Sequence, residues 1–332
     1  MAQIGVVVIG RNEGDRLVRC LQSLRDQLPD NTPIVYVDSG SNDNSIANAK
    51  ALEVHTIALD MSIPFTAARS RNTGFDYLQK EFPEMKYVQF LDGDCELVSG
   101  WMEKAIGHLS NNNRSAVVCG RRRERFPDSS PYNLMADMEW NTPVGDTGAC
   151  GGDALIRVAA LAEISGFNPR LICGEEPDMC FRLRSKGWKI FRLDAEMTLH
   201  DAAIFKFSQF WKRSLRGGWF VGEGCSMYGK TDERYLVKEN RSGLLWGLII
   251  PLLSLLLVWP SQGLSLFAFA GYPLLAWRVY QYRRSAFEDD SRSATIYAFL
   301  VAVSKFPQAV GQLQFAISQL RGKQATLIEY KS

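Results

Sequence analysis

The chain has 332 residues, a formal net charge of +2 and 22% charged residues. This length can hold one large domain with a smaller appendage, and the nearly balanced charge gives no general reason to expect nucleic-acid binding. The seven cysteines form no C-x-x-C pair and no zinc-type spacing, so we expect reduced thiols. No secretory signal is expected, because strand-like residues begin at Ile4.

Short apolar runs alternate with polar, helix-like segments in the N-terminal part of the chain. These runs are Ile4–Ile9, Ile34–Val37 and Val54–Ile57. The first run is continuously apolar, which is typical of a parallel strand buried on both faces. The order strand, helix, strand, helix, strand predicts an α/β fold with a doubly wound, mostly parallel sheet, whose ligands bind at the carboxyl ends of the strands.

A fourth apolar run, Val88–Leu91, leads into Asp92-Gly93-Asp94. Side chains two residues apart on a strand point the same way, so we expect both carboxylates to hold one divalent cation. Gly93 leaves room for a phosphate to approach the backbone. The alternative is an acidic turn that simply follows a strand.

Polar turns also follow the first two strands, at Arg11–Glu13 and at Asp38–Ser45. We expect the carboxylate of Asp38 to accept a hydrogen bond from a nucleotide base, with the first turn beside the same ring. The alternative is a carboxylate that caps the next helix, which Asp43 or Ser45 could do equally well. A helix is predicted to open near residue 67. It directs Arg69 or Arg71 to a diphosphate in one interpretation and to solvent in the other.

A further acidic group opens a predicted helix at Glu175-Glu176-Pro177-Asp178, and Gly187 can end that helix. Proline suits the first helical position, which places the two glutamates at the helix start. A carboxylate directed into a cleft there can act as a general base. The alternative is a favourable electrostatic partner of the helix dipole.

These segments resemble the successive motifs of the family 2 glycosyltransferases. The resemblance covers roughly residues 4–220 and rests on segments 7–13, 37–43, 68–74, 91–94, 151–157, 166–169 and 174–183 in that order. Members of this family are inverting enzymes of GT-A fold that use nucleotide-sugar donors. The resemblance therefore implies a GT-A-like domain and a single-displacement transfer.

The resemblance also implies roles for individual residues. Glu176 stands where the family usually has an aspartate as catalytic base, and Glu175 is its competitor. The implied metal ligands are Asp92, Asp94 and His200, with Mn²⁺ favoured over Mg²⁺ by the imidazole. A structural histidine after an edge strand at 189–193 is the alternative for His200. The implied nucleotide and donor residues are Ile9, Arg11, Asn12, Glu13, Asp38, Ser39, Gly40, Arg69, Asn72, Asp92 and Gly93.

Other segments are assigned to the acceptor side or to a surface. Arg121–Arg125 is expected to be a solvated strand edge, with contact to lipid phosphate as the alternative. The basic and aromatic segment Phe210–Phe220 is predicted to bring Arg213, Arg216 and Trp219 to a diphosphate or to a membrane surface. The acceptor and donor-sugar pocket is predicted at Trp140, Gly151, Gly152, Asp153 and Asp178.

The C-terminal part is strongly apolar at residues 243–259 and 263–277. Basic residues flank this pair and none lies between, which predicts a hairpin at 243–280 that dips into a membrane from the cytoplasmic side. A third apolar stretch, 294–317, contains Lys305 and Pro307 and is expected to be an interfacial or re-entrant helix. The alternative is a buried helical bundle or a homo-oligomer interface. The predicted domains are 1–225, a linker at 226–242, and a membrane-associated region at 243–320.

The expected function is metal-dependent transfer of a sugar from a nucleotide sugar, with UDP-sugars favoured, to an acceptor hydroxyl. The apolar tail favours a lipid-linked saccharide acceptor in polysaccharide or glycolipid synthesis, at the inner or plasma membrane with the catalytic domain facing the cytoplasm. A nucleotidyltransferase is a rival, although Arg11–Gly14 makes a poor triphosphate loop. A second rival is a non-catalytic membrane-bound sensor of sugar nucleotides.

Overall fold

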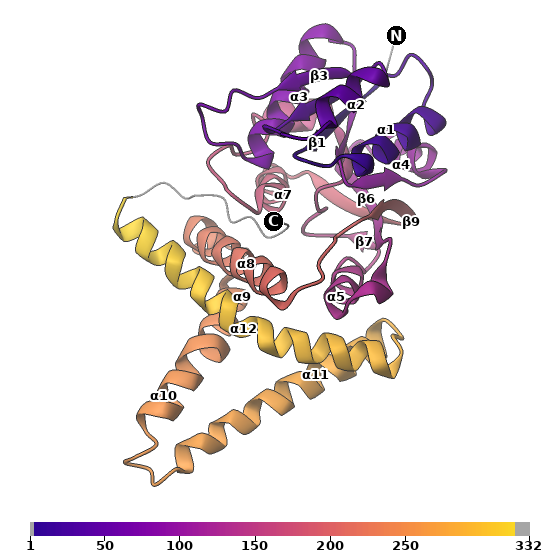
Figure 1. The fold of residues 1–332 in the computed structure, drawn as a ribbon. Helices are drawn as coiled ribbons and strands as arrows, with labels where there is room; N and C mark the ends of the chain where they lie inside the picture. Colours follow the sequence, from indigo (N-terminus) through magenta and orange to yellow (C-terminus); the bar gives the residue numbers. More distant parts are fainter. Residues whose placement is uncertain (1–2, 323–332) are drawn as a thin grey trace. The chain divides into compact units, whose positions relative to one another are not determined.

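The computed structural model describes residues 3–322, so the first two residues of the predicted transferase domain lie outside it. The chain divides into two compact units, whose elements are labelled in Figure 1. The first unit contains the chain up to Arg125 together with Glu139–Ala202, and the second contains Phe126–Met138 and the chain from Ala203. Residues 203–225, which we had assigned to the transferase domain, therefore group with the C-terminal helices.

A nine-stranded sheet forms the centre of the first unit, in the order β3-β2-β1-β4-β8-β6-β9-β5, with β7 paired to β9. The strands are β1 (Ile4–Gly10), β2 (Ile34–Asp38), β3 (His55–Ala58), β4 (Tyr87–Asp92), β5 (Cys95–Leu97), β6 (Ser115–Glu124), β7 (Gly145–Asp146), β8 (Ala154–Arg157) and β9 (Lys189–His200).

The first half of this sheet is parallel, as predicted: β1 pairs with β2 and with β4, and β2 pairs with β3. The second half is mixed, because β8 runs antiparallel to both β4 and β6, and β5 runs antiparallel to β9. The prediction of a mostly parallel sheet is therefore wrong for this half. An apolar run such as Ala154–Ile156 reports burial on both faces but not the direction of the strand.

The strand predicted at 189–193 is longer than expected and does not lie at the edge of the sheet. It is β9, which extends to His200 and pairs with β5, β6 and β7, so it is an interior strand. Its pairing with β6 contains register shifts, which interrupt the alternation that would have revealed its length in the sequence.

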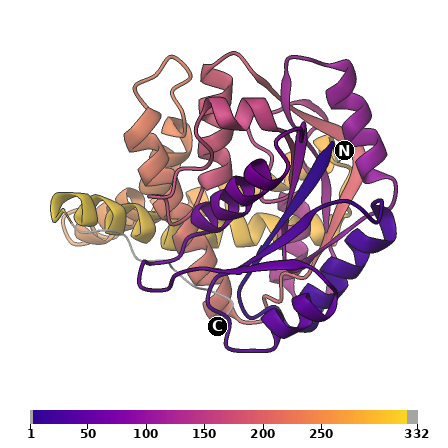
Figure 2. The same ribbon diagram turned by 90° about the horizontal axis from the view of Figure 1, so that it is seen from above.

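Helices cover both faces of the parallel half, with α1 and α2 on one face and α3 on the other (Figure 2). Right-handed crossovers require this arrangement, because the chain moves outward from β1 to β3 and then returns past β1 to β4. The helices of this unit are α1 (Asp15–Gln27), α2 (Ser45–Ala51), α3 (Ala67–Glu81), α4 (Trp101–Asn111), α6 (Val158–Glu163) and α7 (Glu175–Ser185).

The core between α3 and the sheet is built from side chains of β1, β2 and β4. Val7, Val37 and Phe90 are almost completely buried. Complete burial of such a side chain contributes roughly 1.5–3 kcal/mol. Gly74 of α3 lies directly over Val7 and Val37, and a Cβ there would collide with both valines. The helix thus approaches the strands closely enough to fix the positions of its polar residues at the sheet edge.

The second unit is helical. Its long helices α8 and α12 pack against each other, and α12 contributes Ala298, Ala302, Ala309 and Phe315 to the buried part of the unit. This packing fits the buried-bundle alternative for the 294–317 segment. The elements are η1 (Pro127–Ser129), α5 (Pro131–Glu139), α8 (Phe207–Tyr228), α9 (Val237–Leu244), the π-helical η2 (Leu245–Ile249), α10 (Ile250–Leu256), η3 (Leu264–Ala270), α11 (Gly271–Ala286) and α12 (Ser291–Leu320).

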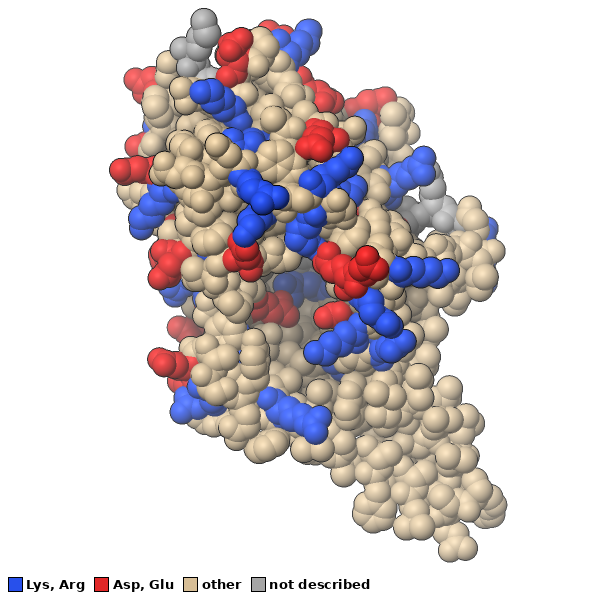
Figure 3. All heavy atoms as spheres, turned by 180° about the vertical axis from the view of Figure 1, so that it is seen from behind, with Lys and Arg blue, Asp and Glu red and all other residues tan. Residues whose placement is uncertain are grey.

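The segment from η2 to α11 exposes many large apolar side chains, and Trp259 is 93% exposed. Figure 3 shows this end of the helical unit without charged side chains on the face drawn. Within the described residues, no helix combines the length and the apolar character needed to cross a membrane. The most exposed apolar side chains of this segment are Leu252, Leu253, Leu255, Leu256, Leu257, Trp259, Leu264, Phe267, Leu274, Trp277 and Tyr282.

Candidate active site

Asp92 and Asp94 lie at the carboxyl end of β4 but face different partners. Asp92 lies between two arginines, with Oδ1 at 2.8 Å from Arg71 Nη2 and Oδ2 at 3.1 Å from Arg122 Nη2. Asp94 instead faces His200, and the two carboxylates fall into separate groups of potential metal ligands. The two carboxylates thus do not face each other in this structure, and that they hold one cation together stays a prediction. The strand ends at Asp92 and Gly93-Asp94 is a turn, so the two-residue period no longer applies.

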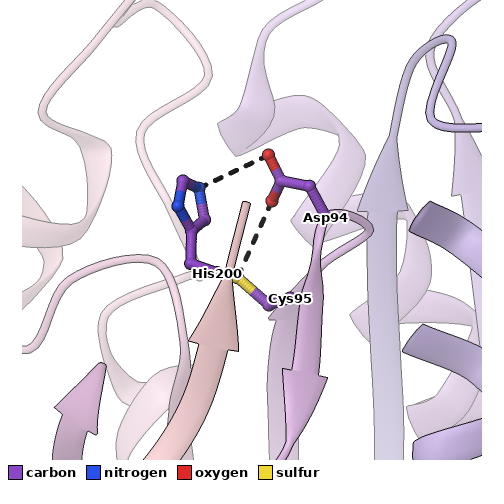
Figure 4. A group of neighbouring side chains, drawn as sticks. All are labelled: Asp94, Cys95 and His200. Atoms are coloured by element: carbon purple, nitrogen blue, oxygen red, sulfur yellow. Dashed lines mark hydrogen bonds and ion pairs between the residues drawn. The ribbon is translucent and has the colours of Figure 1, made fainter. Parts of the chain in front are cut away.

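Asp94 and His200 form the better candidate for a metal centre (Figure 4). Asp94 Oδ2 lies 3.4 Å from His200 Nε2, and both side chains are buried. His200 Nδ1 faces Glu124 Oε2 at 3.5 Å, a carboxylate that can orient the ring. A carboxylate oxygen and an imidazole nitrogen are ligands that suit Mn²⁺, so these residues fit a divalent cation.

Cys95 completes this group geometrically, since its Sγ lies 3.7 Å from Asp94 Oδ1. Burial, together with the nearby carboxylates of Asp153, Asp94 and Asp92, raises the pKa of the Cys95 thiol well above its ordinary value. A protonated thiol is a poor metal ligand. The metal-binding capacity of the group therefore comes from Asp94 and His200.

Glu175 and Glu176 begin α7, where Gly174 adopts a left-handed conformation at φ 77°. Pro177 is the third helical residue and not the first, so both glutamates belong to the helix itself. Arg71 Nη1 lies 2.7 Å from Glu175 Oε1, and Arg71 Nη2 lies 3.0 Å from Glu176 Oε1. The Glu175 side chain is 5% exposed and that of Glu176 is 16% exposed, so Glu176 is the more accessible base.

Glu176 has the electrostatic character that a general base needs. Burial and the neighbouring carboxylates of Glu175 and Asp92 raise the pKa of Glu176 to about 7, although Arg71 opposes this shift. A base whose pKa lies near neutral pH combines a useful deprotonated fraction with a strong affinity for the transferred proton.

Arg71, and not Arg69, is the arginine of α3 that reaches this site. Arg69 donates to the carbonyl oxygens of Ile63 and Asp60 and so holds the loop before α3. Arg71 is 2% exposed and lies among three carboxylates. Burial alone would lower the pKa of its guanidinium, but the carboxylates raise it. Side chains at positions i and i+2 of a helix point to different sides, so only one of Arg69 and Arg71 can reach the sheet edge.

Arg122 was missed by sequence reasoning, which treated 121–125 as a solvated edge. Its side chain is 14% exposed and bridges Asp92 and the buried Asp153. Burial opposes ionisation of Asp92, yet Arg71 and Arg122 hold the pKa of its carboxyl below the ordinary value. The β-bulges of β6 beside Arg121 turn one arginine of the run inward. The run of three arginines at 121–123 gave no signal as to which one this would be.

Gly152 and Asp153 support the arginine pair. A Cβ on Gly152 would lie 2.5 Å from Asp92 Oδ2 and 3.0 Å from the nearest nitrogens of Arg122 and Arg71. Asp153 is fully buried and accepts hydrogen bonds from the Asp92 amide, Arg122 and Thr198. Both residues therefore shape the Asp92 corner, and Asp153 acts from behind it. Gly151 has a left-handed φ of 83° and open space at its Cβ position.

Trp140 lies beside the metal candidates, as the predicted pocket requires. Its ring meets His200 edge-on at 4.7 Å between centroids, and the Arg122 guanidinium lies 5.3 Å from the ring centroid. Asp178 is buried and pairs with Arg182 on the next turn of α7, at 2.8 Å. The structure thus brings Trp140 to the site, whereas the carboxylate of Asp178 stabilises the helix.

The predicted nucleotide-binding turns are joined to each other. The carboxylate of Asp38 accepts hydrogen bonds from the Tyr36 hydroxyl and from the amides of Gly40 and Ser41. Asn12 contacts this second turn through Ser41 and Asn42, and Arg11 stacks on Phe65 at 4.7 Å. Within this arrangement, Asp38 organises the loop through three hydrogen bonds inside the chain.

The remaining predicted donor residues lie around the same strand ends. The Gly93 amide donates to the Ile9 carbonyl at 2.8 Å, and a Cβ on Gly93 would press on that carbonyl and on Glu13. Ser39 shares a hydrogen bond with Ser70 of α3. Asn72 points instead to Phe167: its side-chain amide donates to the Phe167 carbonyl and accepts from the Phe167 amide, so it holds the Gly166 turn.

The α8 residues predicted to reach a diphosphate or a membrane surface belong to the second unit. Trp219 is 7% exposed, packs edge-on against Phe315 and donates to Glu223, so its placement on a surface is corrected. Its spacing in the sequence fits a buried helical face equally well, and α12 occupies that face. Arg213 and Arg216 are partly buried on α8.

A mixed α/β sheet with an acidic strand end, an arginine pair and an acidic helix start defines a GT-A-like glycosyltransferase domain. Residues 5–162 match the family model of Glycosyl transferase family 2. The mannosyltransferase PcManGT from Pyrobaculum calidifontis, solved in complex with GDP-Man and Mn²⁺, has the same fold. It aligns with a TM-score of 0.63 at 16% identity, over 97% of this chain and 88% of that chain.

Two curated relatives also carry glycosyltransferase names. The pre-mycofactocin glycosyltransferase of Mycobacterium tuberculosis is 24% identical over 214 residues, which cover 60% of this chain and 42% of that protein. The glycosyltransferase AglE of Haloferax volcanii is 21% identical over 256 residues, covering 74% of this chain and 80% of that protein. The chain thus spans less than half of the length of the mycobacterial relative.

Proposed function

We propose that this protein transfers a sugar from a nucleoside diphosphate sugar to an acceptor hydroxyl, with inversion at the anomeric carbon. The observation that carries the proposal is the network in which Arg71 joins Glu176 to Asp92, within a family 2 glycosyltransferase domain. It links a base with a pKa of about 7 to the strand end where a donor would lie.

In this mechanism, Glu176 takes the proton from the acceptor hydroxyl while that oxygen attacks the anomeric carbon. The bond to the nucleoside diphosphate breaks, and the diphosphate leaves on the opposite face of the sugar. Arg71 keeps Glu176 and Glu175 in place, and the Trp140 ring packs against His200 and the Arg122 guanidinium. A divalent cation held by Asp94 and His200 would neutralise charge on the departing diphosphate.

The donor is proposed to be a UDP-sugar, as the sequence analysis favours, and a GDP-sugar is the comparison because PcManGT carries GDP-Man. The acceptor is proposed to be a lipid-linked saccharide at the cytoplasmic face of the inner or plasma membrane. The exposed apolar side chains from η2 to α11 support this membrane placement, since such patches are costly in water. A hairpin that dips into one leaflet needs no membrane-crossing helix.

The test is release of nucleoside diphosphate by the purified full chain with Mn²⁺, across a panel of UDP- and GDP-sugars. We expect release from at least one donor and its stimulation by a saccharide acceptor. Release of pyrophosphate from a nucleoside triphosphate and a sugar phosphate would favour a nucleotidyltransferase. Absence of binding and turnover across the panel would reject the proposal.

A further inference from the structure

The helical unit contains a polar cavity that the transfer reaction does not use. It has a volume of about 240 Å³ and lies among α8, α9 and α12. Its polar lining comes from Lys238, Glu239, Ser242, Lys305, Gln308 and Gln312. Glycines bring the backbones close at this place, because a Cβ on Gly218 or Gly247 would collide with the backbone of α12. The walls are therefore fixed by packing between main chains.

Two polar groups in this cavity have no hydrogen-bond partner within the described residues. Lys305 is half-buried and makes no hydrogen bond and no ion pair in the described part of the chain. Burial lowers the pKa of Lys305, and the carboxylate of Glu239 opposes this shift. Gln312 is 4% exposed and donates to Asn240 twice, but its Oε1 accepts no hydrogen bond from the described residues.

The charges and hydrogen-bonding groups of Lys305 and Gln312 indicate which kind of ligand the cavity can bind. The buried amide oxygen of Gln312 carries a free-energy penalty until it is paired, and the half-buried ammonium of Lys305 is partly desolvated. An anionic oxygen would pair with Lys305, and a hydroxyl hydrogen would satisfy Gln312 Oε1. The second lysine, Lys238, offsets the one carboxylate in the lining, Glu239. A phosphate ester that carries a free hydroxyl meets both requirements.

The path of the chain points to a lipid as the source of this phosphate. Lys238 and Ser242 line the cavity, and Leu245, at the next helical spacing, is 43% exposed. From there the helix continues through η2 into α10, where the exposed side chains are apolar. One continuous helix thus runs from a cavity lined by two lysines to an exposed apolar surface. A phospholipid has the matching arrangement, with a charged headgroup joined to apolar chains.

We infer that this cavity binds the phosphate headgroup of an anionic, hydroxyl-bearing phospholipid, with the acyl chains along the exposed apolar residues of η2 and α10. This inference rests on the proposed membrane placement of the helical unit and assigns a specific lipid class to it. The headgroup accepts hydrogen bonds from Lys305 and Lys238 and donates one to Gln312.

The test is co-sedimentation of the full chain with vesicles of phosphatidylcholine alone or with added phosphatidylglycerol. We expect preferential binding to the anionic vesicles. Lys305→Met should weaken that binding by about tenfold, the scale of a hydrogen bond to a charged group. The matched control is Lys230→Met, which removes the same charge from an exposed position of the same unit outside the cavity. Equal losses in both variants would mean diffuse attraction and would overturn the inference.

Two further measurements serve as controls. The first distinguishes a lipid from a soluble phosphate ester, and the second tests whether the variant remains stably folded. Glycerol phosphate, measured by calorimetry, should bind much more weakly than the vesicles do. Equal affinity, with no gain from acyl chains, would overturn the lipid assignment in favour of a soluble phosphate ester. Lys305→Met should not lower the melting temperature, because the charge that it removes is half-buried and makes no ion pair or hydrogen bond with the described residues. Nucleoside diphosphate release without vesicles should be the same in Lys305→Met and wild type, so a failed lipid assay leaves the transfer reaction testable by itself.

Discussion

Arg71 Nη2 lies 3.0 Å from the carboxylate of Glu176 and belongs to a side chain that is 2% exposed. The same nitrogen lies 2.8 Å from Asp92. One buried guanidinium therefore fixes the distance between the candidate base and the acidic end of β4. Removing one partner of a buried ionic group leaves the others uncompensated, so the group should respond as a unit.

Arg71→Gln should lower the free energy of unfolding by about 3–5 kcal/mol and abolish turnover, because three carboxylates lose their common cation. Arg69→Gln is the matched control on the same helix, since the Arg69 guanidinium donates to the backbone carbonyls of Ile63 and Asp60 in its loop and lies outside the carboxylate cluster around Arg71. It should cost about 1.5–3 kcal/mol at most. Urea unfolding compares the two, and equal losses would contradict the role given to Arg71.

Glu176→Gln should reduce the rate of sugar transfer by roughly 10²–10⁴-fold, the usual contribution of a general base, while donor affinity changes little. Glu84→Gln, at an exposed position, serves as the control for removal of a carboxylate charge. The measurements are nucleoside diphosphate release and donor binding by calorimetry. Unchanged turnover in Glu176→Gln would exclude this residue as the base and transfer attention to Glu175.

The pH dependence should report the raised pKa of Glu176. Because the base acts deprotonated, kcat should rise as the pH increases through about 7 and then level off. The folded pKa lies above the ordinary 4.5, so the contribution of Glu176 to stability is complete below about pH 4.5 and is lost as the pH rises through about 7. In Glu176→Gln, unfolding measured across this range should lack that loss.

Gly152→Ala should lower both stability and turnover, because the added methyl group would meet Asp92 and both arginines. Overpacking of this kind costs typically about 1–3 kcal/mol. Gly148→Ala in the same loop is the matched control, since the nearest atom to its Cβ would be 4.0 Å away. Thermal unfolding and donor binding distinguish them. If Gly152→Ala has the stability and donor affinity of the wild type, the loop accommodates the methyl group without loss of free energy of unfolding, and the prediction is wrong.

Removal of the candidate metal ligands should abolish the stabilisation that Mn²⁺ gives to the folded state. A ligand that binds only the folded protein raises its melting temperature, and the stabilisation grows with the logarithm of the ligand concentration divided by Kd. We expect this Mn²⁺-dependent shift to disappear in Asp94→Asn and in His200→Gln. It should persist in His55→Gln, whose imidazole is exposed on β3. A full shift in all three variants would place the cation elsewhere.

The sequence by itself determined the parallel half of the sheet and the groups at its carboxyl edge. Continuous apolar runs such as Ile4–Ile9 can be satisfied only by burial on both faces, and the polar turns must then meet at one edge. The helix α7 and its acidic start were equally predictable from the sequence, because local signals mark helix ends, as Gly187 does just after α7.

Only the tertiary structure decided which charges face one another. Whether Arg69 or Arg71 reaches the site depends on the rotation of α3 over the sheet, and the inward turn of Arg122 depends on bulges in β6. The separation of Asp92 from Asp94 arises where β4 stops and a turn begins. Such choices are made by contacts between segments far apart in the chain, and a local pattern carries no information about them.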